Sequence, residues 1–393
     1  MQEYSWKAPD KFVCPDCVGD DFLKEKIVQN LTAKTCGYCG KSGEEDIAAP
    51  VSAIMESIAQ GLSCRFVDWH DADFPDECDW DEEFAKLPTT EEALRKIPLE
   101  GRGDLLRDVA VAFRCNRWKE KTGGFHDYDM SMRGSWDYLV WTVKHHERFF
   151  FSSTTTMFRF AFQKTPAELL GEIGQIVSEL ELVKPLLAET ELFRVRVLSK
   201  KEDWCLADIE KNLGAPPNDK VLSSQRMNPA GISYFYLAKE RATAMAEALS
   251  KPPCQAALGC FKIRRDIRVL DLMNLPKIPS PFDGERHHEG ETIAFLTEFA
   301  DEISKPVQKD GSEHIEYVPS QVVCEYFAKV FRTEDGKPID GLAYPSAIRP
   351  GGTNIVLFPP QRGTDFSDMA GLVKAEEIEF PNWFDFQAVI RAV

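Results

Sequence analysis

The stretch RMNPAGISYFYLAKERATAMAEAL, residues 226–249, carries an arginine in a turn-rich segment, two tyrosines in a strand-like segment and a glutamate in a helix-like segment. Side chains alternate along a strand, so Tyr234 and Tyr236 point to the same face of a strand over residues 232–237. In a helix over residues 239–249, Glu247 lies beside an apolar stripe but off its centre. The carboxylate is therefore expected at the border of a buried face, where it can point into a cleft.

Three side chains of this stretch suit the binding of a dinucleotide and the cleavage of its glycosidic bond. The guanidinium fork of Arg226 can hold a pyrophosphate with two parallel hydrogen bonds. The ring of Tyr236 can stack on a ring of the ligand, and the Glu247 carboxylate can stabilise positive charge on a sugar. Spacing alone leaves a second interpretation open, in which Arg226 and Glu247 are solvated surface residues.

The composition is that of an acidic globular protein. The chain has 393 residues, of which 43% are hydrophobic and 28% charged, and a formal net charge of −17. This length is enough for two or three domains. An acidic surface repels phosphate backbones, so direct nucleic-acid binding is not expected. The sequence has no apolar run of about 18 residues and no signal-peptide pattern, so we expect no membrane span and a cytoplasmic location.

Four of the eleven cysteines form two closely spaced pairs near the N-terminus. Cys14 and Cys17 form one pair, and Cys36 and Cys39 form the other. Two such pairs that face each other make a tetrahedral site of four thiolates for Zn2+. Because thiolates fill all four positions, we expect a structural ion. The other seven are interpreted as small buried apolar residues in a reducing compartment; they are Cys64, Cys78, Cys115, Cys205, Cys254, Cys260 and Cys324.

The first part of the chain has the apolar spacing of helices. The helices predicted before residue 160 include 47–62, 90–97 and 104–113. A helix from Trp136 is expected to run into an apolar strand near residues 149–151. Thr165 and Pro166 then predict the cap and the first turn of another helix, which extends to about residue 183.

From Phe193 on, short strands and helices are mixed. The strands predicted are 193–198, 234–237, 258–263, 267–270 and 353–358. The helices predicted are 239–249, 291–303 and 320–330. Residues 339–346 are expected to end in a turn. Because strands and helices do not alternate regularly, the pattern indicates an α+β domain and not a doubly wound sheet.

This part of the chain resembles the RES domain, a family named for an arginine, a glutamate and a serine. The family pattern is an Arg-Phe-Asn-Pro-x-Gly turn, a Tyr-Leu-Ala strand and an Ala-x-x-Glu helix, and here Met227 replaces the phenylalanine. Further similar segments, in the right order, are FRVR at 193–196, YVPSQVV at 317–323, DGLAYPS at 340–346 and GGTNIVLF at 351–358. The resemblance covers about residues 190–360.

The N-terminal part is similar to the HEPN-like domain that precedes some RES domains. The features that carry this resemblance are the cysteine pairs, an acidic aromatic helical region and KHHERFFF at 144–151. Many HEPN proteins are ribonucleases with an arginine and a histidine four to six residues apart. Arg65 and His70 have this spacing, but they lie beside an acidic loop and not in a late helix, so we interpret the pair as chance.

The resemblance to RES domains implies a fold like that of ADP-ribosyltransferases and an enzyme that degrades NAD+. It implies that Glu247 stabilises an oxocarbenium-like ribose, that Tyr236 stacks on the nicotinamide or ribose, and that Arg226 holds the pyrophosphate. Ser346 is then a polar contact to phosphate or nicotinamide. Further residues expected to bind the dinucleotide are Arg194, Arg196 and Tyr234.

RES domains are the toxins of bacterial toxin–antitoxin pairs, so the resemblance implies a cytoplasmic bacterial toxin or defence effector with an Xre-like antitoxin protein as partner. A homodimer is a further expectation. The leading function is an NAD+ glycohydrolase or phosphorylase. The alternatives are an ADP-ribosyltransferase that modifies a macromolecular acceptor, a HEPN-type ribonuclease, and an interaction protein without activity.

The expected organisation has four parts. A zinc-knuckle segment occupies residues 1–45, and a mostly α-helical HEPN-like domain occupies 46–185. An α+β RES domain follows at 186–365, and residues 366–393 form a C-terminal extension.

Overall fold

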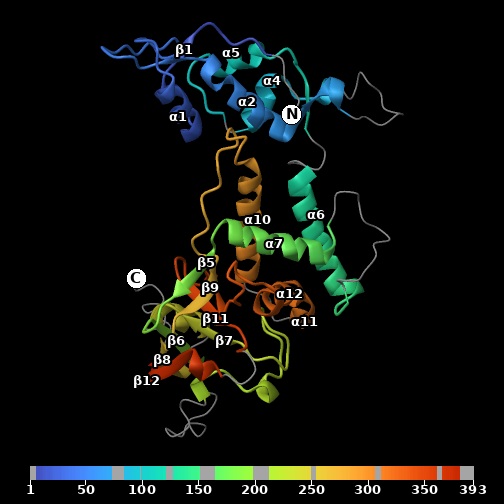
Figure 1. Cartoon of the computed structure of the whole chain (residues 1–393), viewed down its shortest axis with the longest axis vertical. Helices are drawn as coiled ribbons and strands as arrows, with labels where there is room; N and C mark the ends of the chain where they lie inside the picture. Colours follow the sequence, from blue (N-terminus) through green and yellow to red (C-terminus); the bar gives the residue numbers. More distant parts are fainter. Residues whose placement is uncertain are drawn as a thin grey trace. The chain divides into compact units, whose positions relative to one another are not determined.

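The computed structural model describes residues 6–72, 84–97, 99–120, 127–150, 164–197, 212–248, 254–305, 311–360 and 365–380. The chain divides into two compact units (Figure 1). The N-terminal unit comprises Met1–Gly134 and Lys277–Ala294, and the C-terminal unit comprises Ser135–Pro276 and Phe295–Val393. Each unit has a hydrophobic core of its own.

The N-terminal unit consists of short helices and two small antiparallel strand pairs. Its helices are η1 (Pro15–Cys17), α1 (Asp21–Gln29), α2 (Ser52–Arg65), η2 (Trp69–Asp71), α4 (Thr90–Lys96) and α5 (Leu105–Ala112). The strand β1 (Phe12–Val13) pairs with β2 (Ala49–Pro50), and β3 (Phe66–Asp68) pairs with β4 (Trp118–Glu120). The predicted helices at 47–62, 90–97 and 104–113 correspond to α2, α4 and α5.

Side-chain caps fix two helix starts in this unit. The Asp20 carboxylate accepts the Leu23 N–H at 3.0 Å and begins α1. Thr89 begins α4 in a capping box with Glu92, in which each side chain accepts the backbone N–H of the other residue. The next residue, Thr90, is buried, and its hydroxyl donates to the Cys115 carbonyl and accepts the Trp118 indole N–H.

Residues 277–294 complete the core of the N-terminal unit from far along the chain. Phe282 is fully buried among the residues of this core. A side chain at Gly61 would place its Cβ 2.7 Å from the Phe282 ring, so only glycine lets α2 approach Phe282 this closely. Ser280 donates to the Asp20 carboxylate at 2.9 Å. The N-terminal core therefore depends on residues that follow it by about 150 positions in the sequence.

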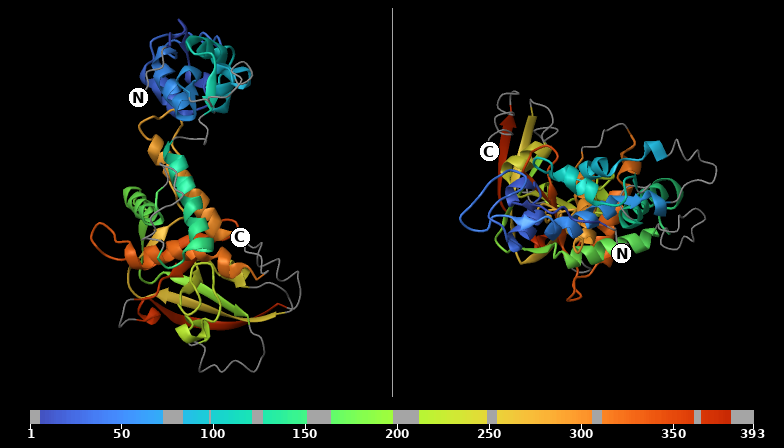
Figure 2. Two further views of the ribbon diagram at one scale, coloured as in Figure 1. Left: turned by 90° about the vertical axis from the view of Figure 1, so that its right-hand side faces the viewer. Right: turned by 90° about the horizontal axis from the view of Figure 1, so that it is seen from above.

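The C-terminal unit is built around a mixed sheet of eight strands (Figure 2). The strands are β5 (Val183–Leu186), β6 (Glu191–Val197), β7 (Phe235–Ala238), β8 (Cys254–Ile263), β9 (Ile267–Asp271), β10 (Gly341–Pro345), β11 (Thr353–Leu357) and β12 (Ala370–Phe380). Their order across the sheet is β12-β8-β6-β7-β11-β10-β9-β5. Only β9 and β10 are parallel, and all other neighbours are antiparallel.

Several helices accompany the sheet, and one of them, α9, lines the candidate site. The chain forms α6 (Asp127–Trp141), η3 (Thr142–His146), α7 (Pro166–Glu179), η7 (Asn218–Lys220), α9 (Arg241–Ala248), α10 (His287–Ser304), α11 (Glu313–Glu316), α12 (Val318–Glu325), η8 (Tyr326–Val330) and η9 (Phe366–Asp368). Ala244 and Met245 of α9 pack against Val195, Ala238 and Leu258 on one face of the sheet. No helix within the described ranges is long and apolar enough to cross a membrane.

The sheet is nearly open between β6 and β7. These strands pair at one position, Phe193 with Ala238, whereas β6 pairs with β8 along its whole length and β7 with β11 along its whole length. The edges of β6 and β7 therefore separate beside α9, which leaves room for a cavity.

The turn expected at the end of residues 339–346 follows Ser346, and the residues before it form β10, which pairs on both sides, with β9 and with β11. Two local predictions differ from the structure. Phe149 and Phe150 lie in no strand and are 85% and 76% exposed, while residue 151 lies outside the described ranges. The helix α7 ends at Glu179, before residue 183.

Two other strands of the sheet were not predicted from the sequence. Residues 183–186 form β5, which pairs with β9. Residues 370–380, in the segment expected as a C-terminal extension, form β12, which pairs with β8 from Ala370–Ile263 to Phe380–Cys254. The α+β class of the C-terminal unit is confirmed, and the bounds of the four expected parts stay predictions.

Candidate functional site

The carboxylate of Glu247 is held by two hydrogen-bond donors from distant parts of the chain. It projects from the last turn of α9. Its Oε1 accepts the Ser346 hydroxyl at 2.6 Å and the Asn354 amide at 2.8 Å. Within the described ranges no hydrogen bond reaches Oε2. The carboxylate is thus oriented through one oxygen, while the second oxygen can contact a ligand.

Ser346 is itself fixed by the turn that follows β10. Its Oγ accepts the backbone N–H of Ile348 at 3.3 Å and that of Arg349 at 3.1 Å, while the hydroxyl proton goes to Glu247. Ser346 is buried. Its hydrogen bonds therefore make it a residue that positions Glu247, whereas the sequence led us to expect a contact to phosphate or nicotinamide.

Tyr236 lies at the same site, on the face of β7 that α9 covers. Its hydroxyl donates to Asn228 Oδ1 at 2.6 Å and accepts the Met227 N–H at 3.3 Å. Burial raises the pKa of Tyr236 well above its ordinary value, so the phenol stays protonated. Because both partners of the hydroxyl belong to the turn after Arg226, the ring is fixed at its polar end and offers its face to the site.

A cavity of about 240 Å³ lies between these side chains. It is lined by Phe193, Arg194, Val195, Gln225, Tyr236, Leu237, Ala238, Ala244, Glu247, Ala248, Tyr344 and Asn354. The cavity coincides with the place where β6 and β7 separate. Tyr236 and Glu247, two of the three predicted catalytic residues, therefore share one cavity.

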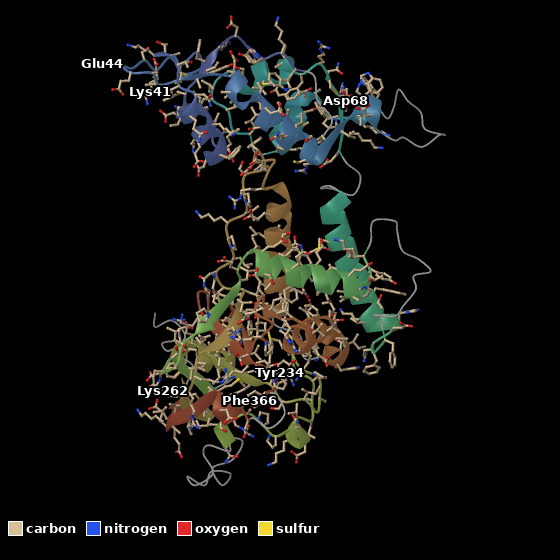
Figure 3. The ribbon with its side chains drawn as sticks, viewed as in Figure 1. Lys41, Glu44, Asp68, Tyr234, Lys262 and Phe366 are labelled. Atoms are coloured by element: carbon tan, nitrogen blue, oxygen red, sulfur yellow. The ribbon has the colours of Figure 1, made fainter. Side chains whose placement is uncertain are left out.

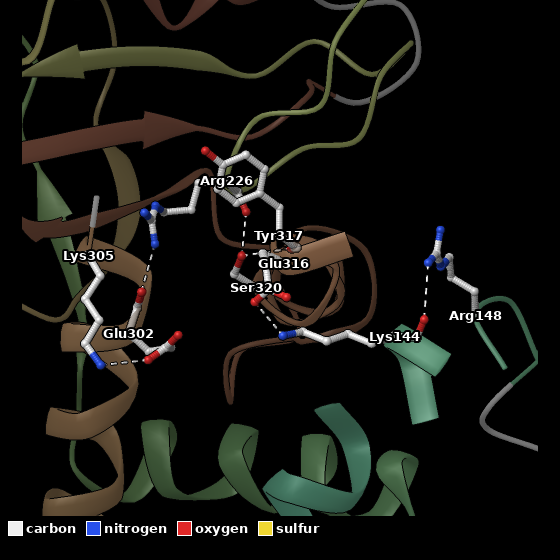
Figure 4. A network of polar contacts seen from close by, with 8 residues as sticks. All are labelled: Lys144, Arg148, Arg226, Glu302, Lys305, Glu316, Tyr317 and Ser320. Atoms are coloured by element: carbon white, nitrogen blue, oxygen red, sulfur yellow. Dashed lines mark hydrogen bonds and ion pairs between the residues drawn. The ribbon is translucent and has the colours of Figure 1, made fainter. Parts of the chain in front are cut away.

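Arg226, the third, is not among the residues that line this cavity. Its guanidinium donates to the backbone carbonyl of Glu302 at 2.8 Å and lies over the ring of Tyr317, 5.6 Å from the ring centre (Figure 4). Its backbone carbonyl accepts the Ser320 hydroxyl at 2.6 Å. The only polar partner of the guanidinium in the described residues is thus a neutral carbonyl.

The electrostatic surroundings connect Arg226 with the cavity. Burial lowers the pKa of Arg226, and the nearby Tyr317, Tyr344, Glu302 and Glu247 oppose this effect. Burial raises the pKa of Tyr344, and the charge of Glu247 raises it further. Arg226 and Glu247 therefore influence each other across the site, although the arginine does not line the cavity.

The other expected binding residues are only partly brought to the site. Arg194 lines the cavity, but its guanidinium donates to the Gly214 carbonyl at 2.9 Å and lies 5.2 Å from the centre of the Phe235 ring. Burial is the main cause that lowers the pKa of Arg194 to about 10.

Arg196 and Tyr234 do not line the cavity. Arg196 is exposed and donates to the Asn212 carbonyl at 2.7 Å. Tyr234 is buried, with its ring 5.5 Å from that of Phe358, and it precedes the first residue of β7 (Figure 3). The expected period-two relation with Tyr236 therefore does not bring Tyr234 into the site.

Sequence reasoning did not assign a role to Asn354 and Tyr344, although both lie in segments that it singled out. Tyr344 and Asn354 face each other across β10 and β11, and Asn354 pairs with Ala238 of β7. This register places both side chains beside Tyr236 and Glu247. A polar residue at the start of an otherwise apolar final strand was the available signal.

The four N-terminal cysteines form a separate cluster in the N-terminal unit. Their Sγ atoms lie within 4.8 Å of one another, with Cys14–Cys17 at 3.7 Å, Cys14–Cys39 at 3.6 Å and Cys17–Cys36 at 3.7 Å. Sulfurs about 2.3 Å from a tetrahedral Zn2+ lie roughly 3.8 Å apart. The spacing of the thiols therefore fits a four-coordinate ion.

Backbone donors support the charge of this cluster. The N–H groups of Cys14 and Tyr38 point to the Cys36 sulfur at 3.4 Å and 3.5 Å. Burial acts to raise the pKa of Cys36, but N–H donors from Cys39, Tyr38 and Cys14 outweigh it and lower the pKa to about 7. These donors favour a thiolate at Cys36, the form in which cysteine binds metal, whereas burial raises the pKa values of Cys14 and Cys17. The four sulfurs are close enough to hold a metal ion.

Arg65 and His70, the pair with ribonuclease-like spacing, have partners in the N-terminal unit. Arg65 forms an ion pair with Glu120 at 2.8 Å and donates to the Lys96 carbonyl. His70 contacts Asp68 at 2.8 Å. Both side chains thus take part in local contacts of β3 and β4.

Comparison with known families finds two domains along the chain. A RES domain is matched by residues 191–378, and a HEPN/RES N-terminal domain 1 is matched by residues 29–157. The chain is therefore a RES domain protein with an N-terminal RES-associated domain. No curated protein and no solved structure matches it, so the expected likeness to ADP-ribosyltransferases stays a prediction.

Proposed function

We propose that this protein cleaves the bond between nicotinamide and ribose in NAD+. A RES domain indicates an enzyme that acts on NAD in general. The observation that carries the finer proposal is the orientation of Glu247 by Ser346 and Asn354 at a cavity that also contains Tyr236 and Tyr344. This arrangement supplies a fixed carboxylate and aromatic walls in one place.

The chemistry requires little proton transfer. Nicotinamide in NAD+ is already a cationic leaving group, so its departure needs no strong general acid. As the bond breaks, positive charge develops on the ribose. A carboxylate that is already oriented stabilises this charge most in the transition state. We assign this role to Oε2 of Glu247, and to Tyr236 a stacking contact with the nicotinamide or the ribose.

The size of the cavity suggests which part of NAD+ it holds. At about 240 Å³ the cavity is smaller than the roughly 300–1,000 Å³ of sites for drug-sized ligands. We therefore assign to it the nicotinamide and its ribose, with the pyrophosphate outside and near Arg226. A charged pyrophosphate is a stronger acceptor than the Glu302 carbonyl, so the guanidinium can exchange one for the other.

The test is an NAD+ assay on the purified full-length chain. Nicotinamide release is measured with and without inorganic phosphate, for the unchanged protein, for Glu247→Gln and for the control Glu377→Gln on β12. We expect release with the unchanged protein and the control, and at least about a hundredfold less with Glu247→Gln. Equal release from all three would contradict the role of Glu247.

The same reactions identify the acceptor of the ADP-ribose. Product that needs inorganic phosphate indicates a phosphorylase, and product formed without it indicates a glycohydrolase. With NAD+ labelled in the adenine, label on protein or nucleic acid indicates the alternative, an ADP-ribosyltransferase.

We further propose that the activity makes the protein a toxin with a repressor-like antitoxin as partner. Growth arrest on expression, absent with Glu247→Gln, tests this.

We also propose that the four N-terminal cysteines bind one structural Zn2+. The support is the near-tetrahedral spacing of the sulfurs and the N–H donors around Cys36. All four positions of the ion are then thiolates, so no position stays open for a substrate and the ion holds the two cysteine pairs together.

A further inference from the structure

A second and larger cavity lies in the C-terminal unit, and none of the roles assigned so far uses it. It has a volume of about 590 Å³, within the range of small-molecule sites. Its lining residues come from the β8–β9 turn, the end of η8, the segments that precede β10 and follow β11, and η9. The cavity shares no lining residue with the cavity at Glu247.

Four cationic side chains converge on this second cavity: Arg265, Arg268, Lys329 and Arg332. Carboxylates orient the first two, since Arg265 pairs with Asp340 at 2.8 Å and Arg268 with Asp335 at 3.2 Å.

Lys329 and Arg332 differ from that pair. Both side chains are exposed, and within the described part of the chain neither forms an ion pair. Arg332 donates a hydrogen bond to the carbonyl of its neighbour Phe331. The cationic groups of both residues are therefore available to a ligand in the cavity. They suit a phosphate, which accepts charge-assisted hydrogen bonds from both.

The cavity also carries two carboxylates and an apolar wall. Asp365 accepts the N–H groups of Phe366 and Asp368 in the capping box of η9. Asp368 accepts the Asp365 N–H through Oδ2, so its Oδ1 is not used by the cap. Carboxylates of this kind accept hydrogen bonds from ribose hydroxyls. The apolar part of the lining consists of Ile339, Phe358, Pro359, Pro360 and Met369.

From this combination we propose that the second cavity binds a ribonucleoside phosphate. The phosphate contacts Lys329 and Arg332, the ribose hydroxyls contact Asp365 and Asp368, and the base packs on the apolar wall. A free phosphate would leave the carboxylates and the apolar wall without a partner, and a purely apolar ligand would leave the cations without one. A nucleoside phosphate satisfies all three parts of the lining.

The position of the second cavity separates it from the NAD+ site. Ile339 and Asp340, which line it, directly precede β10, whereas Tyr344 near the end of β10 lines the cavity at Glu247. Four residues of a strand span about 13 Å. β11 runs back the same way, from Asn354 at the first cavity to Phe358 at the second. One pair of strands thus connects two separate sites.

The experiment measures direct binding to the full-length chain by calorimetry. The probes are AMP, adenosine, ribose 5-phosphate and inorganic phosphate. We expect AMP to bind at least about tenfold more tightly than adenosine, because adenosine lacks the charged group. Inorganic phosphate alone should bind at least about tenfold more weakly than AMP. Adenosine that binds as tightly as AMP, or no detectable binding of AMP at millimolar concentration, would overturn the proposal.

Paired variants locate the bound AMP. Lys329→Ala/Arg332→Ala removes the proposed phosphate contacts and should weaken AMP binding at least about tenfold. Lys262→Ala/Lys374→Ala, which changes the net charge equally through residues that do not line the cavity, should leave AMP binding unchanged. Asp368→Asn keeps an acceptor for the cap of η9 and should weaken AMP more than inorganic phosphate.

The cavity at Glu247 is the competing location for AMP. Arg226→Gln removes the proposed pyrophosphate contact of the NAD+ site and should leave AMP binding unchanged, whereas a loss of AMP binding in this variant, with binding intact in Lys329→Ala/Arg332→Ala, would place AMP at the NAD+ site. Because calorimetry reports binding and not turnover, its outcome is independent of whether the protein cleaves NAD+.

Discussion

At the scale of single residues, the site is organised around one oxygen atom. Ser346, in the turn after β10, and Asn354, in β11, both donate to Oε1 of Glu247, and their donors fix the direction of the carboxylate. We therefore propose that Ser346 acts through the glutamate. This arrangement predicts that the effects of the serine and the glutamate are not independent.

We therefore expect Ser346→Ala to lower kcat for NAD+ cleavage about 10–100-fold, because Glu247 loses a hydrogen bond and its fixed orientation. In a protein that already carries Glu247→Gln, the same substitution should have little further effect. The measurement is a double-mutant cycle of nicotinamide release. Equal losses in both backgrounds would mean that Ser346 contacts the substrate directly.

Tyr236 combines two roles that substitution can separate. Tyr236→Phe removes the hydrogen bonds to Asn228 and Met227 but keeps the ring. We expect this variant to lower the free energy of unfolding by about 1–3 kcal/mol, since the side-chain amide oxygen of Asn228 loses the tyrosine hydroxyl as its donor. NAD+ cleavage should stay within a few-fold of that of the unchanged protein. Tyr236→Ala should lose cleavage as well. Urea denaturation and nicotinamide release, measured on both variants, distinguish the phenol from the ring.

At the scale of helices and strands, the elements with strong local signals agree with the sequence. Thr165 and Pro166 begin α7, and Thr165 forms a capping box with Glu168. β6 has the expected alternation of apolar and basic residues. Such elements are recognisable because their signals, the caps and the side-chain period, lie within a few residues of one another.

The contribution of the α7 cap to stability can be measured by substitution of Thr165. Thr165→Ala removes the acceptor for the Glu168 N–H and should lower the free energy of unfolding by about 1 kcal/mol. Thr165→Ser keeps the acceptor and serves as the control. Chemical denaturation should show a lower midpoint for the alanine variant only. A midpoint equal to that of the unchanged protein would show that Pro166 alone is enough to begin the helix.

β4 provides a second element-scale prediction, which concerns pH. Its Glu120 pairs with Lys96 of α4 and with Arg65 of α2 at 2.6 and 2.8 Å. The hydrogen bond from Lys96 is the main cause that lowers the pKa of Glu120, and Arg65 contributes. The folded state therefore binds a proton less readily than the unfolded state. The stabilisation is present above the unfolded pKa of about 4.5 and is lost as pH falls through the lower folded value.

Glu120→Gln should accordingly be less stable than the unchanged protein at pH 7, by up to about 1 kcal/mol because the pair is partly exposed. The difference should shrink below pH 4.5. Denaturation midpoints of the N-terminal unit at several pH values measure it. A difference that stays constant down to pH 3 would assign the effect to packing and not to charge.

The features that were not predicted from the sequence depend on contacts between residues that are far apart along the chain. The sequence predicted the turn after residue 346 but not the strand before it, because β10 exists through its pairing with β9 and β11. Tyr234 alternates with Tyr236 in the sequence, but β7 begins one residue too late to place it in the site. The partner of the Arg226 guanidinium, the Glu302 carbonyl, is 76 residues away. None of these relations has a signal within a short window of sequence.

At the scale of the whole molecule, two sets of long-range contacts stabilise the core of the N-terminal unit. One is the cluster of four cysteines, which joins segments 22 residues apart, from Cys14 to Cys36. The other is Phe282, which fills its core from within the segment matched to the RES domain. Both sets of contacts contribute buried residues to a core that the helices of residues 6–134 alone would leave incomplete.

Removal of the metal tests the contribution of the four-cysteine cluster. We expect one Zn2+ per chain by elemental analysis, and a chelator should lower the unfolding temperature of the N-terminal unit by several degrees. Cys36→Ser should have the same effect and lose the metal. Cys260→Ser, at a partly exposed cysteine of β8, is the matched control and should keep both the metal and the unfolding temperature. Retention of zinc by Cys36→Ser would contradict the assignment of the ligands.

Phe282 has a consequence for the order of events during synthesis. A ribosome adds about 5–20 residues per second, so the roughly 150 residues between Gly134 and Phe282 take about 7–30 s to appear. Throughout that interval the nascent N-terminal unit lacks its last core residue. Most of the RES sheet has by then been made, since only β10, β11 and β12 follow Phe282. The N-terminal unit thus matures late and nearly together with the catalytic sheet, although it is the first part of the chain to be translated.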